Sequence, residues 1–343
     1  MNSRERVLRA IRFETPDRVP IGYSVSPGAF LKYGQELLDL IRRYPHDFFD
    51  VNEVRLPERD TAHYRPDGSY YKEVTDGWGC TWVYYLEGIS GEVKNSPLAD
   101  WKALKDLQVP QLPDSPEERA KAKAGMDRMK ERYIGWGSAD IFYERMQWLR
   151  GVEDLAMDIA EDAEEVYQLA DLLLEKNILP RIELALESGA DVIGFGDDWG
   201  TQQQLLINPA AWRRIFKPRY QRAFDLVHQG GALTWMHSDG MILDIIPDLI
   251  EIGLDVVNPQ LVVMDLEDVR KAADHKIAIY TDIDRQYRLP FGTPAEVREH
   301  IGDIFDKLAY PDGGLLYGAG IYDDMPLENI KAMLDAFVEY GKK

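Results

Sequence analysis

Short apolar runs and longer amphipathic segments alternate along most of the chain. From about Gly135 onward, runs rich in Val, Ile and Phe are separated by segments with helical spacing of apolar residues. This pattern is typical of repeated β-α units on a parallel sheet. The predicted strands are Tyr133–Gly137, Asp191–Gly196, Ala232–Met236, Asp255–Asn258, Ile277–Asp282 and Gly314–Gly318. The predicted helices are Ala163–Glu187, Pro209–His228, Ile242–Glu251, Leu266–His275, Pro294–Leu308 and Leu327–Tyr340.

The first part of the chain adds further elements to this pattern. It predicts helices at Arg4–Arg12 and Tyr33–Arg43 and strands at Val19–Val25 and near Asp47–Val54, which brings the strand total to about eight. Residues 1–343 are therefore predicted to form a single-domain (β/α)₈ TIM barrel. Alternating aromatic and polar residues in Tyr70–Leu86 predict an inserted β-hairpin, and the Pro-punctuated, then charged, segment 95–130 is expected to be a peripheral connection.

Composition narrows the classes of partner. The net charge of −20 would repel nucleic acid and anionic lipid, so we expect neither as a partner. We find no apolar stretch of the roughly 18 to 20 residues that a membrane span needs, and Met1–Arg12 is too charged for a signal-peptide core. A single cysteine, Cys80, allows no intrachain disulfide. These features predict a cytoplasmic protein that acts on a small molecule.

Polar residues follow the predicted strands at the point where each strand ends. In a barrel of this kind the carboxyl ends of the strands surround the functional site. The residues at these positions are Asp197 and Asp198; His237, Ser238 and Asp239; Asn258 and Gln260; and Asp282 and Asp284. Carboxylates around one imidazole suit either metal binding or general acid–base chemistry.

His237 and Asp239 are the sharpest local feature. Their i, i+2 spacing at a strand end places both side chains on the same side of the sheet, where they could bind one divalent ion through nitrogen and oxygen. Such an ion needs a further ligand from Asp197, Asp198 or Asp282. Because adjacent strand residues point in opposite directions, only one of Asp197 and Asp198 is expected to face the cavity. The alternative makes His237 a hydrogen-bonded core residue and Asp239 a helix N-cap.

Aromatic and amide side chains are candidates for a substrate pocket. Trp136, Tyr143 and Trp199 come shortly after predicted strands or at their ends, and they either line an apolar pocket or belong to the core. Gln203 and Asn258 are predicted to contact the substrate with them.

Four segments of the chain match the pattern of a known family: RERVLRAIRFETPDRVPIG near the start, GADVIGFGDDWGTQQQLLINPAAWRRIFKPRY, MHSDGMI followed by IPDLIEIGLDVVNP, and YDDMPLENI. In these segments the chain resembles the uroporphyrinogen decarboxylase superfamily, and more narrowly its corrinoid-dependent methyltransferase-like branch. This resemblance implies a (β/α)₈ barrel with the site at the carboxyl ends of the strands. It also implies methyl transfer between a small methoxylated or methylated substrate and a corrinoid protein, and pairing into a homodimer.

The resemblance carries over to individual residues only in part. Zinc-dependent members of that branch have His-x-Cys at this strand end and a distal cysteine near the last strand. In this chain His237 matches the histidine, Asp239 stands at the first cysteine and Ala319 at the distal ligand. Any metal, zinc or another divalent ion, would therefore be bound through nitrogen and oxygen. In this hypothesis, His237, Asp239 and one of Asp197 or Asp198 bind the metal or protonate the leaving oxygen.

Two other functions stay open. One is a metal-free carboxy-lyase in which Asp282 or Asp198 stabilises a cationic intermediate, as a carboxylate does in the decarboxylase. The decarboxylase's Arg-Gln-Ala-Gly-Arg motif is missing around residues 21–30, which counts against a substrate that carries eight carboxylates. The other is a catalytically silent ligand-binding barrel, because the positions of both cysteine ligands are changed.

Overall fold

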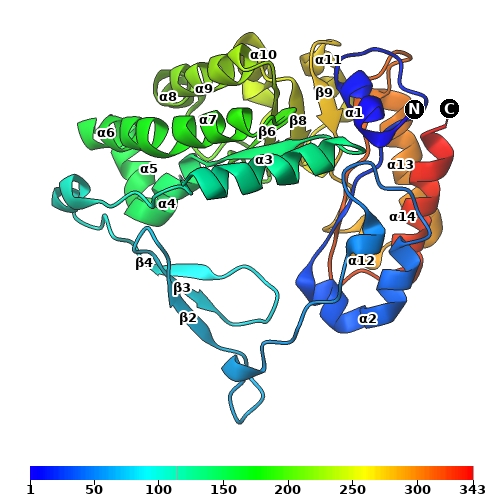
Figure 1. Ribbon diagram of the computed structural model, residues 1–343, viewed down its shortest axis with the longest axis horizontal. Helices are drawn as coiled ribbons and strands as arrows, with labels where there is room; N and C mark the ends of the chain where they lie inside the picture. The colour runs from blue at the N-terminus through cyan, green and yellow to red at the C-terminus, as the bar shows by residue number, and fades with distance from the viewer. Residues whose placement is uncertain (114, 343) are drawn as a thin grey trace.

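A curved parallel sheet forms the centre of the molecule. The computed structural model describes residues 1–113 and 115–342. Six parallel strands run in the order β10-β9-β8-β7-β6-β5, and helices cover their outer face (Figure 1). The six strands are β5 (Trp136–Ile141), β6 (Val192–Gly196), β7 (Leu233–Ser238), β8 (Val256–Pro259), β9 (Ala278–Tyr280) and β10 (Leu315–Leu316). The six strands predicted after residue 130 are thereby confirmed.

Helices connect these strands and cover them. The helices are α1 (Ser3–Ile11), α2 (Pro27–Ile41), α3 (Pro116–Lys130), α4 (Tyr143–Arg150), α5 (Val152–Ala160), α6 (Glu164–Leu173), α7 (Leu179–Glu187), α8 (Pro209–Ile215), α9 (Lys217–Gln229), α10 (Ile246–Glu251), α11 (Leu266–Ala273), α12 (Arg288–Phe291), α13 (Pro294–Leu308) and α14 (Leu327–Tyr340). The predicted bounds of the last two long helices match α13 and α14. The predicted helix 209–228 is instead two helices, because Pro218 lacks the N–H that a continuous helix would need at that position.

The start and the end of the chain lie side by side next to β10. Strand β1 (Ser24–Val25) pairs in parallel with β11 (Gly320–Ile321), and Ile21 forms a parallel bridge with Tyr317 just after β10. The termini lie close together, and the Val19 N–H donates to the Gly341 carbonyl at 2.9 Å. This parallel α/β architecture is of the (β/α)₈ TIM-barrel type.

The strand predicted near Asp47–Val54 is wrong. The segment lies beside Ile21, but side chains take up the backbone groups that a strand ladder would use. Nδ1 of His46 accepts the N–H groups of Phe48 and Phe49 at 3.1 and 3.2 Å. The buried Asp47 carboxylate is bound by Arg6, Arg18 and the Ile21 N–H. Such local bonds compete with regular structure, so the segment instead ends in a 3₁₀ turn at Val51–Glu53.

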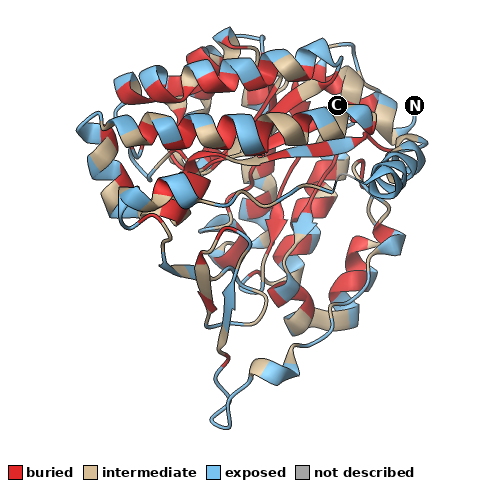
Figure 2. Ribbon diagram, turned by 60° about the vertical axis from the view of Figure 1, so that its left-hand side comes forward, coloured by how far each residue is buried: buried red, intermediate tan, exposed pale blue. Residues whose placement is uncertain are grey.

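Helix α1 closes the amino-terminal end of the barrel. Val7, Ala10 and Ile11 pack with Trp235, and the cluster continues through one buried residue from each of several neighbouring strands. The Gly314 N–H donates to the Ala10 carbonyl at 2.7 Å, which fixes the helix to the sheet. Figure 2 shows the strands of the central sheet buried and most of the helices around it buried only on the side that faces the sheet. This end is packed, so the open end is the carboxyl-terminal one.

The inserted hairpin is confirmed and has a third strand. Strands β2 (Lys72–Thr75), β3 (Thr81–Tyr84) and β4 (Glu92–Asn95) form an antiparallel sheet in the order β2-β3-β4. Figure 1 shows this sheet projecting from the helical layer beyond α4. Its link to α4 is aromatic: Trp82 packs edge-on against Trp148 at 4.7 Å between ring centroids. In residues 1–113 and 115–342, no helix has the length and apolar character to cross a lipid bilayer.

Candidate active site at the carboxyl ends of the strands

His237 lies at the carboxyl end of β7, and its neighbour on β8 orients it. The register pairs His237 with Asn258, and Nδ1 of His237 lies 2.8 Å from Oδ1 of Asn258. The amide group of Asn258 donates to the carbonyls of Tyr280 and Thr281 at 2.9 and 3.2 Å, which makes its oxygen the acceptor. His237 therefore carries its proton on Nδ1. The lone pair of Nε2 is free for a metal ion or a substrate proton.

Two carboxylates lie opposite that nitrogen. Nε2 of His237 is 3.5 Å from Oδ1 of Asp239 and 3.7 Å from Oδ1 of Asp198. The ligand atoms of the three residues all lie within 4.8 Å of one another. Oδ1 of Asp239 is buried and makes no hydrogen bond to any described residue. Because an unpaired buried carboxylate oxygen is costly, this atom fits a ligand position for a divalent cation. The donor set of one imidazole and two carboxylates also fits such an ion.

Two glycines bring the loops after β6 and β7 into contact. A Cβ on Gly240, which has φ +78°, would collide with the carbonyl of Gly200. The Gly200 N–H donates to the Asp239 carbonyl at 3.1 Å, and the Asp239 N–H donates to Oδ1 of Asp198 at 2.8 Å. This close approach holds Asp198 beside Asp239.

Asp197 lies outside this group, although it was a predicted metal ligand. Its side chain is buried and accepts the N–H groups of Phe142 and Glu144 and the hydroxyl of Tyr220. Since no side chain of α4 caps that helix, Asp197 acts as its N-cap from a neighbouring strand. Burial raises the pKa of Asp197 to about 8, and its hydrogen bonds oppose the shift. Asp198, the adjacent residue, is the one that faces His237.

Asp282 lies at the edge of the same site, beside an arginine that the sequence pattern did not single out. Nε of Arg285 is 3.9 Å from Oδ2 of Asp282, and its Nη2 donates to Oδ2 of Asp239. Burial raises the pKa of Asp282 to about 6, and the charge of Arg285 opposes the shift. Arg285 follows Asp282 by three residues, so a search beyond the first two residues after each strand would have included it.

Glu144, in the first turn of α4, is the other residue that was missed. Burial and the negative charge of Asp198 raise its pKa to about 7, and the Asp198 N–H donates to its carboxylate. The prediction ended this strand at Gly137, whereas β5 continues to Ile141. With the observed strand end, Glu144 would have been among the residues that follow a strand.

Of the three aromatic residues predicted to line a pocket, Tyr143 and Trp199 belong to the core, whereas Trp136 is exposed. Trp199 and Tyr143 are buried and stack at 4.3 Å between ring centroids. Trp136 begins β5 and pairs with Val192 of β6, whereas His237 pairs with Gly196 of the same strand. Trp136 therefore lies four residues, or roughly 13 Å along the strand, below the level of His237. Gln203 is exposed in the loop after β6. Asn258 holds His237, and Ala319 is a buried methyl group without ligand capacity.

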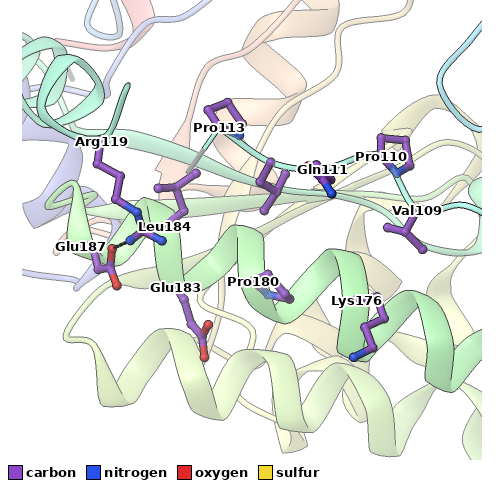
Figure 3. Close-up of a pocket in the computed structure, with 11 residues that line it drawn as sticks. Val109, Pro110, Gln111, Pro113, Arg119, Lys176, Pro180, Glu183, Leu184 and Glu187 are labelled. Carbon is purple, nitrogen blue, oxygen red and sulfur yellow. Dashed lines mark hydrogen bonds and ion pairs between the residues drawn. The ribbon is translucent and has the colours of Figure 1, made fainter. Parts of the chain in front are cut away.

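A separate groove lies outside the barrel. It has a volume of about 500 Å³ and runs between residues 109–113 and α7. Arg119 of α3 pairs with Glu187 of α7 at its edge (Figure 3). Its lining comes from the outer helices and their connections and shares no residue with the site around His237.

Comparison with known proteins places the chain in a family. The profile described as uroporphyrinogen decarboxylase (URO-D) matches residues 146–340, more than half of the chain. The chain belongs to the uroporphyrinogen decarboxylase family. The matched segment includes His237, Asp239 and Asp198, and the recognition from sequence is thereby confirmed.

Individual relatives of this family member are enzymes of two kinds. Uroporphyrinogen decarboxylase of Prochlorococcus marinus (strain NATL2A) is 24% identical over 96% of this chain and 95% of the relative. The methylcobamide:CoM methyltransferase MtaA of Methanosarcina barkeri is 26% identical over 57% of this chain and 52% of the relative. A methyltransferase structure from Methanosarcina mazei superimposes with a TM-score of 0.68 at 18% identity, over 99% of both chains. That likeness confirms the barrel fold.

Proposed function

We propose that this family member is a corrinoid-linked methyltransferase that acts through a metal ion at His237. Its substrate would be a small methoxylated or methylated compound, with a corrinoid protein as methyl donor or acceptor. The observation that carries the proposal is the grouping of Nε2 of His237 with carboxylates of Asp198 and Asp239 within 4.8 Å. Similarity to the MtaA methyltransferase supports the choice of reaction.

The residues that would hold the ion are His237, Asp198 and Asp239. The buried, unpaired Oδ1 of Asp239 supports this assignment. Carboxylates replace thiolate ligands in this site, so a harder ion than in a His-x-Cys site is favoured. The ion, when bound, supplies Lewis-acid polarisation of the atom that loses or gains the methyl group.

The remaining groups of the site would position and protonate the substrate. Demethylation of a methyl ether breaks the bond between oxygen and methyl carbon, transfers the methyl group to the partner's corrinoid and leaves the oxygen to take up a proton. Asp282, with a pKa of about 6, and Glu144, with a pKa of about 7, retain protons closer to neutral pH than ordinary carboxyls do. Asn258 keeps the imidazole in the tautomer that leaves Nε2 free.

Decarboxylation of a porphyrinogen is the second candidate. It is favoured by the near full-length similarity to a decarboxylase. The chain carries no arginine in residues 21–30, and Arg285 in the site already faces Asp239 and Asp282. A substrate with eight carboxylates would meet several uncompensated negative charges there.

Parallel assays separate the two reactions. Metal-loaded protein is mixed anaerobically with cob(I)alamin and a small methoxylated compound, and methylation of the cobalt is followed by absorbance. A second sample receives uroporphyrinogen, and released carbon dioxide is measured. We expect methyl transfer that His237→Ala abolishes without lowering the melting temperature by more than a few degrees. Carbon dioxide release without methyl transfer would establish the decarboxylase instead.

A further inference from the structure

We infer that Arg285 is a positioning residue that makes Asp239 a single-oxygen ligand for the metal ion. This inference rests on the metal site proposed above. Arg285 comes from the loop after β9, whereas Asp239 follows β7, so the contact joins two strand ends across the site.

The two oxygens of Asp239 have different surroundings. Oδ2 accepts a hydrogen bond from Nη2 of Arg285. Oδ1 is buried, has no hydrogen bond to a described residue and lies 3.5 Å from Nε2 of His237. With Oδ2 engaged by the guanidinium, the carboxylate cannot rotate freely, and Oδ1 stays directed at the imidazole. Outer partners of this kind commonly fix the orientation of a ligating carboxylate.

Arg285 itself is fixed by the turn that carries it. Oδ1 of the buried Asp284 accepts the N–H groups of Gln286 and Tyr287 at 3.0 and 2.8 Å. The Leu289 N–H donates to the Asp284 carbonyl at 3.0 Å. Asp282 faces the guanidinium from the other side, with Oδ2 at 3.9 Å from Nε. The backbone and the side chain of Arg285 are thus both held before any ion binds.

A competing role for Arg285 predicts the opposite change in metal affinity when the residue is replaced. If the guanidinium only neutralised excess negative charge, it would repel a divalent cation, and its removal would tighten metal binding. If it positions Asp239, its removal releases Oδ2, allows the carboxylate to turn and weakens metal binding. The direction of the change in the dissociation constant therefore distinguishes the two roles.

The test compares metal binding by three variants with that by the full-length wild-type chain. Chelator-treated protein is titrated calorimetrically with Mn²⁺ and with Zn²⁺. We expect Arg285→Gln to raise the dissociation constant by about 10- to 100-fold. Arg285→Lys, which keeps the charge but loses the planar fork, should show a smaller increase. Arg288→Gln, an exposed site in the same segment, removes the same charge and should leave the constant unchanged.

Each result supports or overturns the inference. Equal or tighter binding by Arg285→Gln, or an equal loss in Arg288→Gln, would overturn it. If circular dichroism shows that Arg285→Gln is unfolded, the metal affinity of Arg285→Lys becomes the test. Wild-type affinity in that variant would overturn the positioning role. Wild-type protein that binds neither ion would remove the proposed metal site and the inference together. Wild-type binding that Arg285→Gln retains would remove the inference alone.

Discussion

Asn258 determines which nitrogen of His237 carries the proton. Its oxygen lies 2.8 Å from Nδ1 of the imidazole, while its amide group is engaged by two backbone carbonyls of the next strand. The strand register that places residues 237 and 258 side by side therefore also sets the tautomer of the histidine. Nε2 is left as the coordinating or accepting atom.

Asn258→Ala is expected to weaken metal binding by about 10- to 100-fold, because His237 loses the partner that fixes its ring. The barrel should remain folded, since the substituted side chain is only partly buried. Titration calorimetry with Zn²⁺ gives the dissociation constant, and circular dichroism verifies the fold. An unchanged constant would show that the imidazole is oriented by something other than Asn258.

Replacing Asp197 by alanine should destabilise the protein much more than replacing Asp198. Asp197→Ala leaves the N–H groups of Phe142 and Glu144 and the Tyr220 hydroxyl without their buried acceptor. We expect it to lower the free energy of unfolding by about 3 to 5 kcal/mol. Asp198→Ala removes a half-exposed carboxylate and one hydrogen bond, so it should cost only about 1 kcal/mol.

Urea unfolding measures the stability of both variants, and calorimetry measures their affinity for Zn²⁺. Asp198→Ala should bind the ion more weakly than wild type at nearly unchanged stability. A stable Asp197→Ala variant that has lost metal binding would reverse the roles of the two aspartates.

Most of the fold follows from the periodicity of the sequence. The buried strand β6 is a continuous run of apolar residues and glycine, and Thr293-Pro294 marks the start of α13. The region around residue 47 could not be predicted in the same way. Its apolar residues resemble those of a strand, but hydrogen bonds of two side chains determine its conformation. Asp47 accepts the Ile21 N–H, and His46 accepts the Phe48 N–H.

The site was predictable as a set of strand ends but not in its details. The expectation that the residues just after each strand form the site identified His237, Asp239, Asp198 and Asp282. Sequence alone could not tell which of the two adjacent aspartates faces His237. The choice depends on α4, whose first N–H groups donate to Asp197 and hold its side chain away from the site. Trp199 follows a strand end as a pocket residue would, yet it packs against Tyr143 and Trp212 in the core.

His46 should make the protein sensitive to acid. Burial lowers its pKa to about 4, and protonation of Nδ1 would place a proton against the N–H groups of Phe48 and Phe49. The unfolded chain takes up this proton near pH 6.5, so stability is lost as the pH falls from about 6.5 to 4. The contribution is about 2 to 3 kcal/mol over that interval.

The His46→Asn variant tests this effect, because its side-chain oxygen can still accept from the same N–H groups. The free energy of unfolding is measured at several pH values between 4 and 7 for both proteins. The variant should show the shallower dependence on pH. Parallel curves would mean that other groups account for the acid sensitivity.

Metal content measured together with metal affinity tests the central claim most directly. Wild-type protein, His237→Ala and Asp239→Ala are loaded with Zn²⁺ or Mn²⁺, freed of excess ion and analysed by mass spectrometry for bound metal, with calorimetry on the same samples. We predict one equivalent of a divalent ion in the wild type and its loss in both variants, with folding retained. A wild-type protein without stoichiometric metal, or full metal content in His237→Ala, would contradict the account.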